Sequence, residues 1–232
     1  HSDAWTANTP ATSGAVDSRA ITPRAHVIPI GVDTQLFAGG DPAGLRQQLP
    51  EKEFLLLFVG RLVDKKGCRS LLEALTLLPL ALRNRTTLWI VGDGNQRSLL
   101  EQTTKDLGLS QKVRFWGTIR NRYLPDFYAA ADLFVVPSIE AVSGDSEGQG
   151  VVILEAFASR ACVLATRTGG IDAVVQDDVT GRLVTANRPR DLACAMEQLL
   201  NDPDLRARLV ETAFGKVKDC YDWKRIASEF EG

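Results

Sequence analysis

Short apolar runs alternate with amphipathic stretches along most of the chain. The run Phe54–Val59 is apolar throughout, which predicts a strand buried on both faces of a sheet. Leu71, Leu72, Leu75 and Leu78 fall on one face of a helix that follows it. The alternation continues toward the C-terminus and predicts five more strands, at Leu88–Val91, Val113–Trp116, Leu133–Pro137, Ala161–Ala165 and Gly181–Val184.

Helical patterns separate these strands. The predicted helices are Leu99–Lys105, Tyr123–Ala130, Val151–Ala158, Ile171–Gln176 and Asp191–Leu200. Another helix opens at Asp202-Pro203, an N-cap residue followed by proline at the first helical position. Alternation at this spacing predicts an α/β fold, a Rossmann-like parallel sheet with helices on both faces. Ligands of such sheets bind at the carboxyl ends of the strands, where most of the glycine-containing loops of this chain fall.

Composition and charge exclude several classes of protein. The 232 residues are 44% hydrophobic, enough for one large domain or for one domain and part of another. With 27 basic and 29 acidic residues the net charge is -2, and no basic stripe predicts a nucleic-acid partner. Only two histidines are present, so a histidine-based metal site is not expected. No stretch has the length of a membrane span, and no secretory signal opens the chain.

The cysteines are scattered along the chain and form no Cys-x-x-Cys pair. They are Cys68, Cys162, Cys194 and Cys220. Two of them lie in strongly apolar stretches, so we expect buried thiols in a reducing cytosol rather than disulfides or metal ligands.

Two carboxylates eight residues apart, Glu147 and Glu155, carry the strongest chemical signal. Between them Gly148-Gln149-Gly150 runs into the apolar stretch that begins with Val151-Val152. A tight turn into a helix exposes unpaired N–H groups and about half a unit of positive charge, which favour a phosphate. Glu155 would lie one to two turns into the helix, where it can accept hydrogen bonds from vicinal hydroxyls, and Glu147 would lie in the loop ahead. Phosphate with hydroxyls on both sides describes a sugar nucleotide.

Two cations follow the first buried strand. Arg61 stands at its carboxyl end and Lys66 just before the next helix, an arrangement that suits a diphosphate, although ordinary solvated charges are equally compatible with the spacing. The lone Gly92-Asp93-Gly94 lacks the third glycine and the acid of a dinucleotide fingerprint, so NAD or FAD binding is not expected and Asp93 is expected to shape the turn. For Glu155 the apolar neighbours argue against a merely solvent-facing acid.

Together these motifs resemble the nucleotide-sugar-binding, C-terminal half of a GT-B glycosyltransferase of family 4, the retaining group 1 enzymes. The resemblance runs from about Val27 to the C-terminus. It rests on Pro29-Ile30-Gly31-Val32-Asp33, Val59-Gly60-Arg61-Leu62, Lys65-Lys66-Gly67, Val91-Gly92-Asp93-Gly94, Phe115-Trp116-Gly117, Pro137-Ser138, the two glutamates with their glycines, Thr168-Gly169-Gly170 and Thr180-Gly181-Arg182-Leu183-Val184.

The resemblance implies a role for each matched residue. Arg61 and Lys66 would hold the donor diphosphate and, with Glu147 near the reacting centre, form the catalytic set. Glu155 would bind the ribose. The implied donor-binding residues are Arg61, Lys66, Thr118, Ile119, Gly148, Gly150, Val151, Val152 and Glu155, of which Thr118 and Ile119 line the nucleobase slot. No metal or other cofactor is implied, because cationic side chains and a helix dipole offset the charge of the substrate, a UDP- or GDP-sugar.

The resemblance also predicts the domain organisation. Residues 1–25 look like the end of an N-terminal acceptor domain, with a strand at Ala4–Thr9, residues 26–50 like an interdomain linker, and residues 51–232 like the donor-binding domain. The resemblance implies that the rest of an N-terminal GT-B half lies outside this sequence and that the last helix, Trp223–Phe230, crosses back to it. Two features depart from the family: the loop 138–145 is long, and Ala173, beside Asp172, stands where many relatives carry glutamate.

The expected function is transfer of a hexose from the nucleotide sugar to a polysaccharide or lipid-linked acceptor, with this chain alone inactive. The location implied is cytoplasmic, with peripheral association of the full-length protein at the inner face of the membrane left open. Two alternatives remain at this point: a GT-B sugar-nucleotide epimerase or sugar-phosphate synthase, and a non-catalytic nucleotide-binding module. Fold analogy alone does not decide among them.

Overall fold

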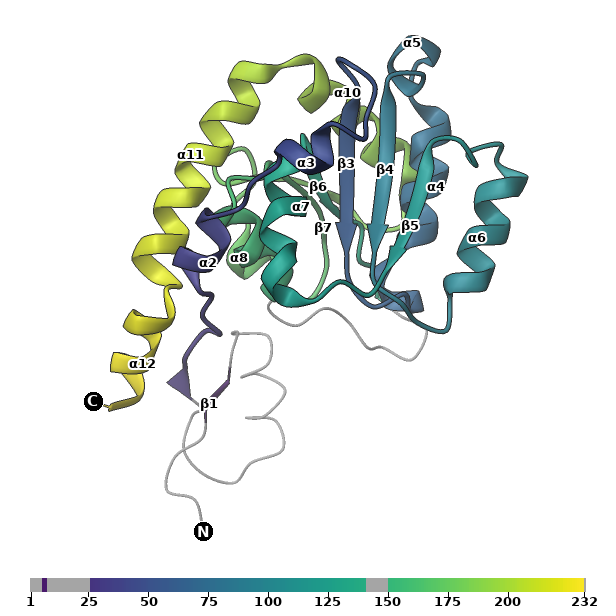
Figure 1. Cartoon of the computed structure of the whole chain (residues 1–232). Coiled ribbons are helices and arrows are strands. Elements are labelled where there is room, and N and C mark those ends of the chain that lie inside the picture. Colours follow the sequence, from purple (N-terminus) through teal and green to yellow (C-terminus); the bar gives the residue numbers. More distant parts are fainter. Residues whose placement is uncertain (1–5, 8–25, 141–149, 232) are drawn as a thin grey trace.

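A parallel sheet of six strands forms the centre of the computed structural model, which describes residues 6–7, 26–140 and 150–231 (Figure 1). The strands are β3 (Phe54–Val59), β4 (Thr86–Val91), β5 (Val113–Gly117), β6 (Leu133–Val136), β7 (Val163–Arg167) and β8 (Arg182–Thr185). Their order is β5-β4-β3-β6-β7-β8, and every neighbouring pair is parallel. The α/β fold predicted from the sequence is confirmed.

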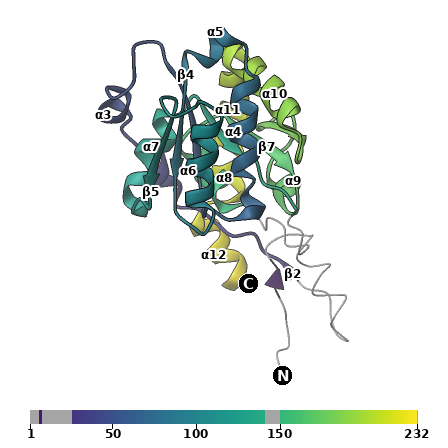
Figure 2. The same ribbon diagram turned by 90° about the vertical axis from the view of Figure 1, so that its right-hand side faces the viewer.

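Helices cover both faces of the sheet. One face carries α4 (Cys68–Leu77), α6 (Arg97–Asp106) and α10 (Pro189–Asn201), of which α4 and α6 face the viewer in Figure 2. The other face carries α2 (Thr34–Ala38), α7 (Leu124–Ala130), α8 (Val151–Ala158) and part of α11 (Pro203–Cys220). Each face of the sheet therefore has its own apolar core.

The apolar run of β3 shows why this arrangement forms. Successive side chains of a strand point to opposite faces, and here Leu55 and Leu57 enter one core while Leu56 and Phe58 enter the other. All four side chains are buried. A strand covered on both faces needs apolar residues at every position, as the sequence analysis predicted for this run.

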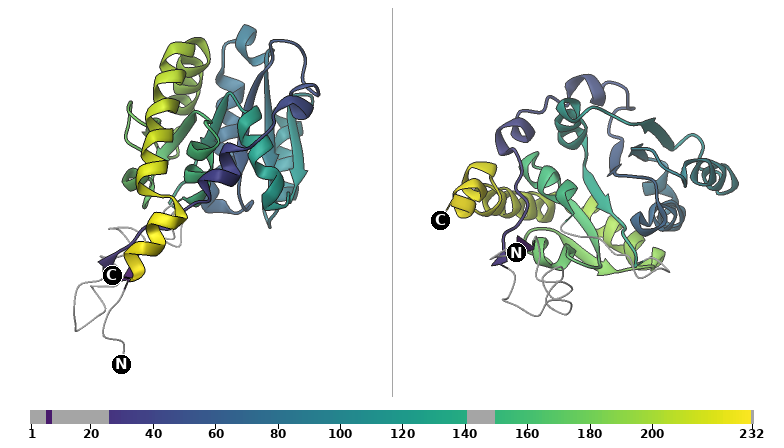
Figure 3. Two further views of the ribbon diagram at one scale, coloured as in Figure 1. Left: turned by 60° about the vertical axis from the view of Figure 1, so that its left-hand side comes forward. Right: turned by 90° about the horizontal axis from the view of Figure 1, so that it is seen from below.

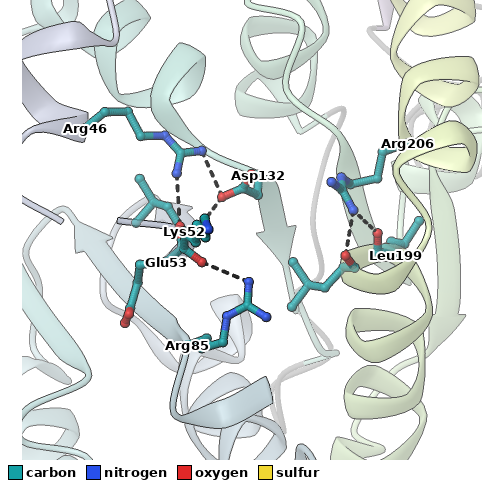
Figure 4. Close-up of polar contacts among 9 residues, drawn as sticks. Arg46, Lys52, Glu53, Arg85, Asp132, Leu199 and Arg206 are labelled. Atoms are coloured by element: carbon teal, nitrogen blue, oxygen red, sulfur yellow. Dashed lines mark hydrogen bonds and ion pairs between the residues drawn. The ribbon is translucent and has the colours of Figure 1, made fainter. Parts of the chain in front are cut away.

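The segment 26–50, predicted to be a linker, contains two short helices. In α2 the carboxylate of Asp33 caps the helix by accepting from the N–H of Leu36 at 2.9 Å. In α3 (Ala43–Arg46), Arg46 donates to Asp132 at 2.8 Å and to the carbonyl of Glu53 at 3.3 Å (Figure 4). Asp132 also accepts from the N–H of Leu55 at 2.7 Å, so α3 is tied to the amino edge of the sheet. Helices of four or five residues carry too little periodicity to be found from the pattern alone.

Other differences from the predicted elements are small. The strands begin or end within two residues of the predicted bounds, and the structure adds α5 (Leu80–Arg83) and the 3-10 helices η1 (Asp64–Lys66) and η2 (Asn121–Tyr123). The helix predicted after the fifth strand is shorter, α9 (Ile171–Val174). Arg206 of α11 donates to the carbonyls of Leu199 and Leu200, which joins α11 to the end of α10 (Figure 4).

The two ends of the described chain meet below the sheet. Strands β1 (Thr6–Ala7) and β2 (His26–Val27) form a separate parallel pair, and β1 falls within the strand predicted at 4–9. The N–H of Val32 donates to the carbonyl of Tyr221 at 2.8 Å, and the start of α12 (Trp223–Glu231) donates back to Val32 at 3.2 Å. The segment that leads into α2 therefore lies beside α12 (Figure 3).

Candidate functional site at the carboxyl edge of the sheet

The order of the strands reverses between β3 and β6. From β3 the chain builds outward through β4 to β5, and it then returns to place β6 on the other side of β3. At such a switch point the loops after the two central strands diverge and leave a crevice at the carboxyl edge, where α/β proteins bind ligands. The loop after β3 carries Arg61 and Lys66, and the chain after β6 leads to Gly150 and α8.

The loop after β3 is held close to the end of β6. The N–H of Ile139 donates to the carbonyl of Lys65 at 2.8 Å. Gly67 has a φ of 63°, and a Cβ added to it would lie 1.9 Å from the carbonyl oxygen of Pro137. Only glycine fits this left-handed position against the neighbouring backbone. The first turn of α4 therefore begins in direct contact with the end of β6.

The two predicted cations share this loop. Arg61 is exposed, and Lys66 is half-buried. A Cβ built on Gly60 would lie 3.8 Å from Cε of Lys66, so the lysine side chain folds back over the carboxyl end of β3. The structure thus places both side chains at the end of the same central strand.

The loop after β4 is built around two glycines and one aspartate. A Cβ on Gly92 would lie 1.9 Å from the carbonyl oxygen of Gly60, and a Cβ on Gly94 would lie 2.4 Å from that of Leu62. Asp93 accepts from the N–H of Gly94 at 2.7 Å and from Arg97 at 3.0 Å. The Gly94 N–H and then Arg97 lower the pKa of Asp93. The prediction that Asp93 shapes this turn is confirmed.

Helix α8 begins at a glycine, on the β6 side of the switch point. Gly150 is the N-cap, with φ 67° and ψ 59°, and no side chain caps the helix among the described residues. Val151 and Val152, which open the helix, are half-buried. The N–H groups of a first turn without a side-chain cap provide hydrogen-bond donors and positive potential for an anion. Glu147 and Gly148, predicted to lie just ahead of this turn, fall outside the described residues.

Glu155 lies one turn into α8, with apolar neighbours on both sides. Ile153, Leu154, Ala156 and Phe157 are buried, whereas Glu155 is half-buried. Its carboxylate accepts a hydrogen bond from the hydroxyl of Tyr128 at 2.7 Å. Burial raises the pKa of Glu155, and the hydrogen bond from Tyr128 acts in the opposite direction. The sequence analysis did not identify Tyr128, because a tyrosine in an apolar helix gives no signal of a partner 27 residues away.

The predicted nucleobase residues follow β5 at the same edge. Thr118 is exposed, and Ile119 is half-buried against the core. The carbonyl of Gly117, at the end of β5, accepts from the N–H of Gly92 at 2.8 Å, which connects this loop to the loop after β4. The loops after β3, β4 and β5 are therefore joined along one edge.

Asp172 does not have a free carboxylate. It accepts from Arg167 at 3.0 Å, and the same guanidinium donates to Asp177 at 2.7 Å. Its neighbour Ala173 is exposed and offers no polar group. The position at which many relatives of the resembled family carry glutamate is thus occupied by alanine beside an ion-paired aspartate.

The remaining observations concern the cysteines, possible metal ligands and the length of the helices. All four cysteines are free; Cys68 and Cys162 are buried as expected, but Cys194 and Cys220 are exposed because they lie on outer positions of α10 and α11. Burial raises the pKa of both buried thiols to about 12. Among the described residues no group of three or more histidine, cysteine and acidic side chains could hold a metal ion. None of the helices described is long and apolar enough to cross a membrane.

Comparison with known proteins identifies the family of this chain. The family model for glycosyl transferases group 1 matches residues 45–216. A D-inositol 3-phosphate glycosyltransferase of Frankia alni is 37% identical over 215 residues, which are 88% of this chain and 51% of that protein. The chain thus spans about half the length of this relative.

Two solved structures are similar over most of the chain. HepE of Anabaena, in complex with UDP, has a TM-score of 0.88 and 28% identity over 99% of this chain and 63% of that one. The C-terminal domain of LpcC, a glycosyl transferase group 1 family protein of Francisella tularensis, has a TM-score of 0.71 and 28% identity over 83% of this chain and 100% of that one. This chain therefore belongs to the glycosyl transferases group 1 family and has the fold of a GT-B domain.

Proposed function

We propose that the chain is the C-terminal, donor-binding domain of a retaining family 4 glycosyltransferase. The donor is a UDP- or GDP-sugar, and a hexose passes to a hydroxyl of a glycan or a lipid-linked acceptor. Similarity to a domain described as C-terminal supports this placement, and the chain spans about half of the Frankia protein. An N-terminal GT-B half supplies most of the acceptor site in this proposal, and residues 26–50 connect the two halves.

One observation carries the proposal. At the switch point, a loop with two cations, Arg61 and Lys66, lies on one side. On the other side lies the start of α8, for which the described residues provide no side-chain cap. A half-buried carboxylate, Glu155, follows one turn into that helix. Cations and helical N–H groups suit the diphosphate, and the carboxylate suits the ribose hydroxyls.

The chemistry follows from where charge develops. When the bond between the sugar and the diphosphate breaks, negative charge grows on the leaving phosphate. Arg61, Lys66 and the first turn of α8 stabilise that charge more than they stabilise the intact donor, which lowers the barrier. Glu147 contacts the donor sugar near the reacting carbon. No metal or other cofactor is part of this proposal.

A binding screen tests the function. UDP, GDP and ADP are each added to the chain, and thermal unfolding is followed, because a ligand that binds only the folded state raises the transition temperature. UDP is the first candidate, since HepE was solved with UDP. We expect UDP or GDP to raise the transition temperature. A nucleotide sugar should bind without turnover, because in this proposal the acceptor site lies in the other GT-B half. If none of the three nucleotides shifts the transition, the proposal is wrong.

A phosphorylated small molecule is the second candidate for the acceptor. The Frankia relative is named a D-inositol 3-phosphate glycosyltransferase, which supports a polyol phosphate or sugar phosphate as this second candidate. The donor site would be the same in both cases. Product analysis of the full-length enzyme, with a glycan and with a sugar phosphate as separate acceptors, distinguishes the two acceptor classes. A product assay with water as the only acceptor tests the epimerase alternative.

A further inference from the structure

The hydroxyl of Tyr128 reaches the donor site from within the core. Tyr128 lies in α7 and is fully buried, and its hydroxyl donates to Oε2 of Glu155 in α8 at 2.7 Å. Its ring packs edge-on against Phe37 of α2 and Phe134 of β6, at centroid distances of 5.9 and 5.0 Å. Contacts with α2, β6 and α8 therefore hold the ring and its hydroxyl in place.

This bond leaves half of the carboxylate of Glu155 for another partner. In the part of the chain that the structure describes, the only side-chain hydrogen bond of Glu155 is the one to Tyr128 through Oε2. A carboxylate can accept about four hydrogen bonds on its two oxygens. Because α8 fixes the Cα and Tyr128 fixes Oε2, Oε1 is held in one orientation before any ligand arrives.

The electrostatics fit a donor that keeps its proton. Burial, and then the charge of Glu155, raise the pKa of Tyr128 well above its usual range. The tyrosine therefore stays protonated and donates to Glu155 over the whole physiological range of pH. A hydrogen bond to an ionised acceptor is stronger than one between neutral groups, which suits a fixed support.

We propose that Tyr128 is a positioning residue that holds Glu155 so that its second oxygen receives the vicinal hydroxyls of the ribose. The inference rests on the proposed function, because it concerns the same donor site. A positioning role can be told from a purely structural role of Tyr128, because the loss of affinity on removing its hydroxyl then depends on the ribose hydroxyls of the ligand. Because the carboxylate of Glu155 is already ordered before the ligand arrives, less conformational entropy is lost on binding.

The test is calorimetric titration of wild type and Tyr128→Phe with three probes: UDP, its 2′,3′-dideoxy analogue and inorganic pyrophosphate. We expect Tyr128→Phe to weaken UDP binding by up to about tenfold, because Glu155 must then be ordered when the ligand binds. The dideoxy analogue and pyrophosphate, which lack both hydroxyls, should bind the two proteins equally. Tyr221→Phe, a half-buried tyrosine near α12, is the matched control and should bind UDP like wild type.

Each result decides between the proposals. Equal losses for UDP and for pyrophosphate would show that Tyr128 only maintains the fold, and an unchanged UDP affinity would show that Glu155 needs no support; either result overturns the inference. If wild type binds neither these probes nor GDP and its 2′,3′-dideoxy analogue, the proposed function and the inference are both overturned.

A second variant covers the case in which Tyr128→Phe does not fold. Phe37→Leu keeps the hydroxyl but loosens the packing of the ring, and we expect a smaller loss that is again confined to UDP. A loss of the same size for pyrophosphate, or no loss for UDP, contradicts the inference.

Discussion

Gly67 and Pro137 are in contact across the switch point of the sheet, so closely that a Cβ on Gly67 would lie 1.9 Å from the carbonyl oxygen of Pro137. The two residues belong to the loops that follow β3 and β6, the two central strands. Their contact sets the distance between the loop that carries the cations and the chain that leads to α8. A glycine at this position is thus a requirement of the site as well as of the turn.

Gly67→Ala should destabilise the domain by about 2 kcal/mol or more, because the new Cβ adopts an unfavourable φ and clashes with backbone that cannot move easily. Urea unfolding measures the change. Gly215→Ala is the control: this glycine lies in α11 with nothing within 4 Å of an added Cβ. The control should gain up to about 1 kcal/mol from helix propensity. Equal stability of Gly67→Ala and wild type would contradict the close contact.

Arg61→Ala and Lys66→Ala should each weaken the binding of a nucleoside diphosphate by roughly 1.5–3 kcal/mol without unfolding the domain, because each removes a charge-assisted bond to phosphate. Calorimetric titration at two salt concentrations measures the loss, which should be smaller at high salt. Lys105→Ala, an exposed lysine in the last turn of α6, is the control and should leave binding unchanged. Unchanged affinity in both site variants would leave Arg61 and Lys66 as ordinary solvated charges.

Glu147→Gln should affect the sugar and not the nucleotide, because the proposed partner of Glu147 is the donor sugar. In the full-length enzyme we expect lower turnover while the affinity for free nucleotide stays near that of wild type. Glu155→Gln should instead raise the dissociation constant of the free nucleotide, since an amide is a weaker acceptor than a carboxylate. Nucleotide titration and donor kinetics on both variants measure these effects. Identical losses in the two variants would show that the glutamates do not have separate roles.

Glu155→Gln should also change how stability depends on pH. Burial raises the pKa of Glu155 above its ordinary value of 4.5, so the native state holds the proton more tightly than the unfolded chain does. The free energy of unfolding therefore falls as pH rises from the unfolded pKa through the folded pKa. Glutamine removes this fall, so the variant should gain stability relative to wild type as the pH rises above 4.5. Urea unfolding at several pH values checks this, and parallel curves for the two proteins would contradict it.

The amino-acid sequence alone determined the strands of the sheet, most of the longer helices and several turns between them. The run Phe54–Val59 is apolar at every position, which predicted a strand covered on both faces, and the structure confirms it. Asp93 between two glycines predicted a turn shaped by its own side chain, and the hydrogen bond to Gly94 confirms it. The glycine at 150 and the apolar run after it predicted the start of α8. These are local features, set by backbone freedom and by the period of the side chains.

The tertiary structure decided which distant residues meet. Tyr128 and Glu155 are 27 residues apart, and their hydrogen bond exists only because α7 and α8 pack on the same face of the sheet. The short helices of segment 26–50 also depend on distant partners, as Arg46 does on Asp132. Asp172, beside the alanine that stands where many relatives carry glutamate, is paired with Arg167. Periodicity and turn preference act over a few residues, whereas these contacts arise from the packing of whole elements, so no local pattern contains them.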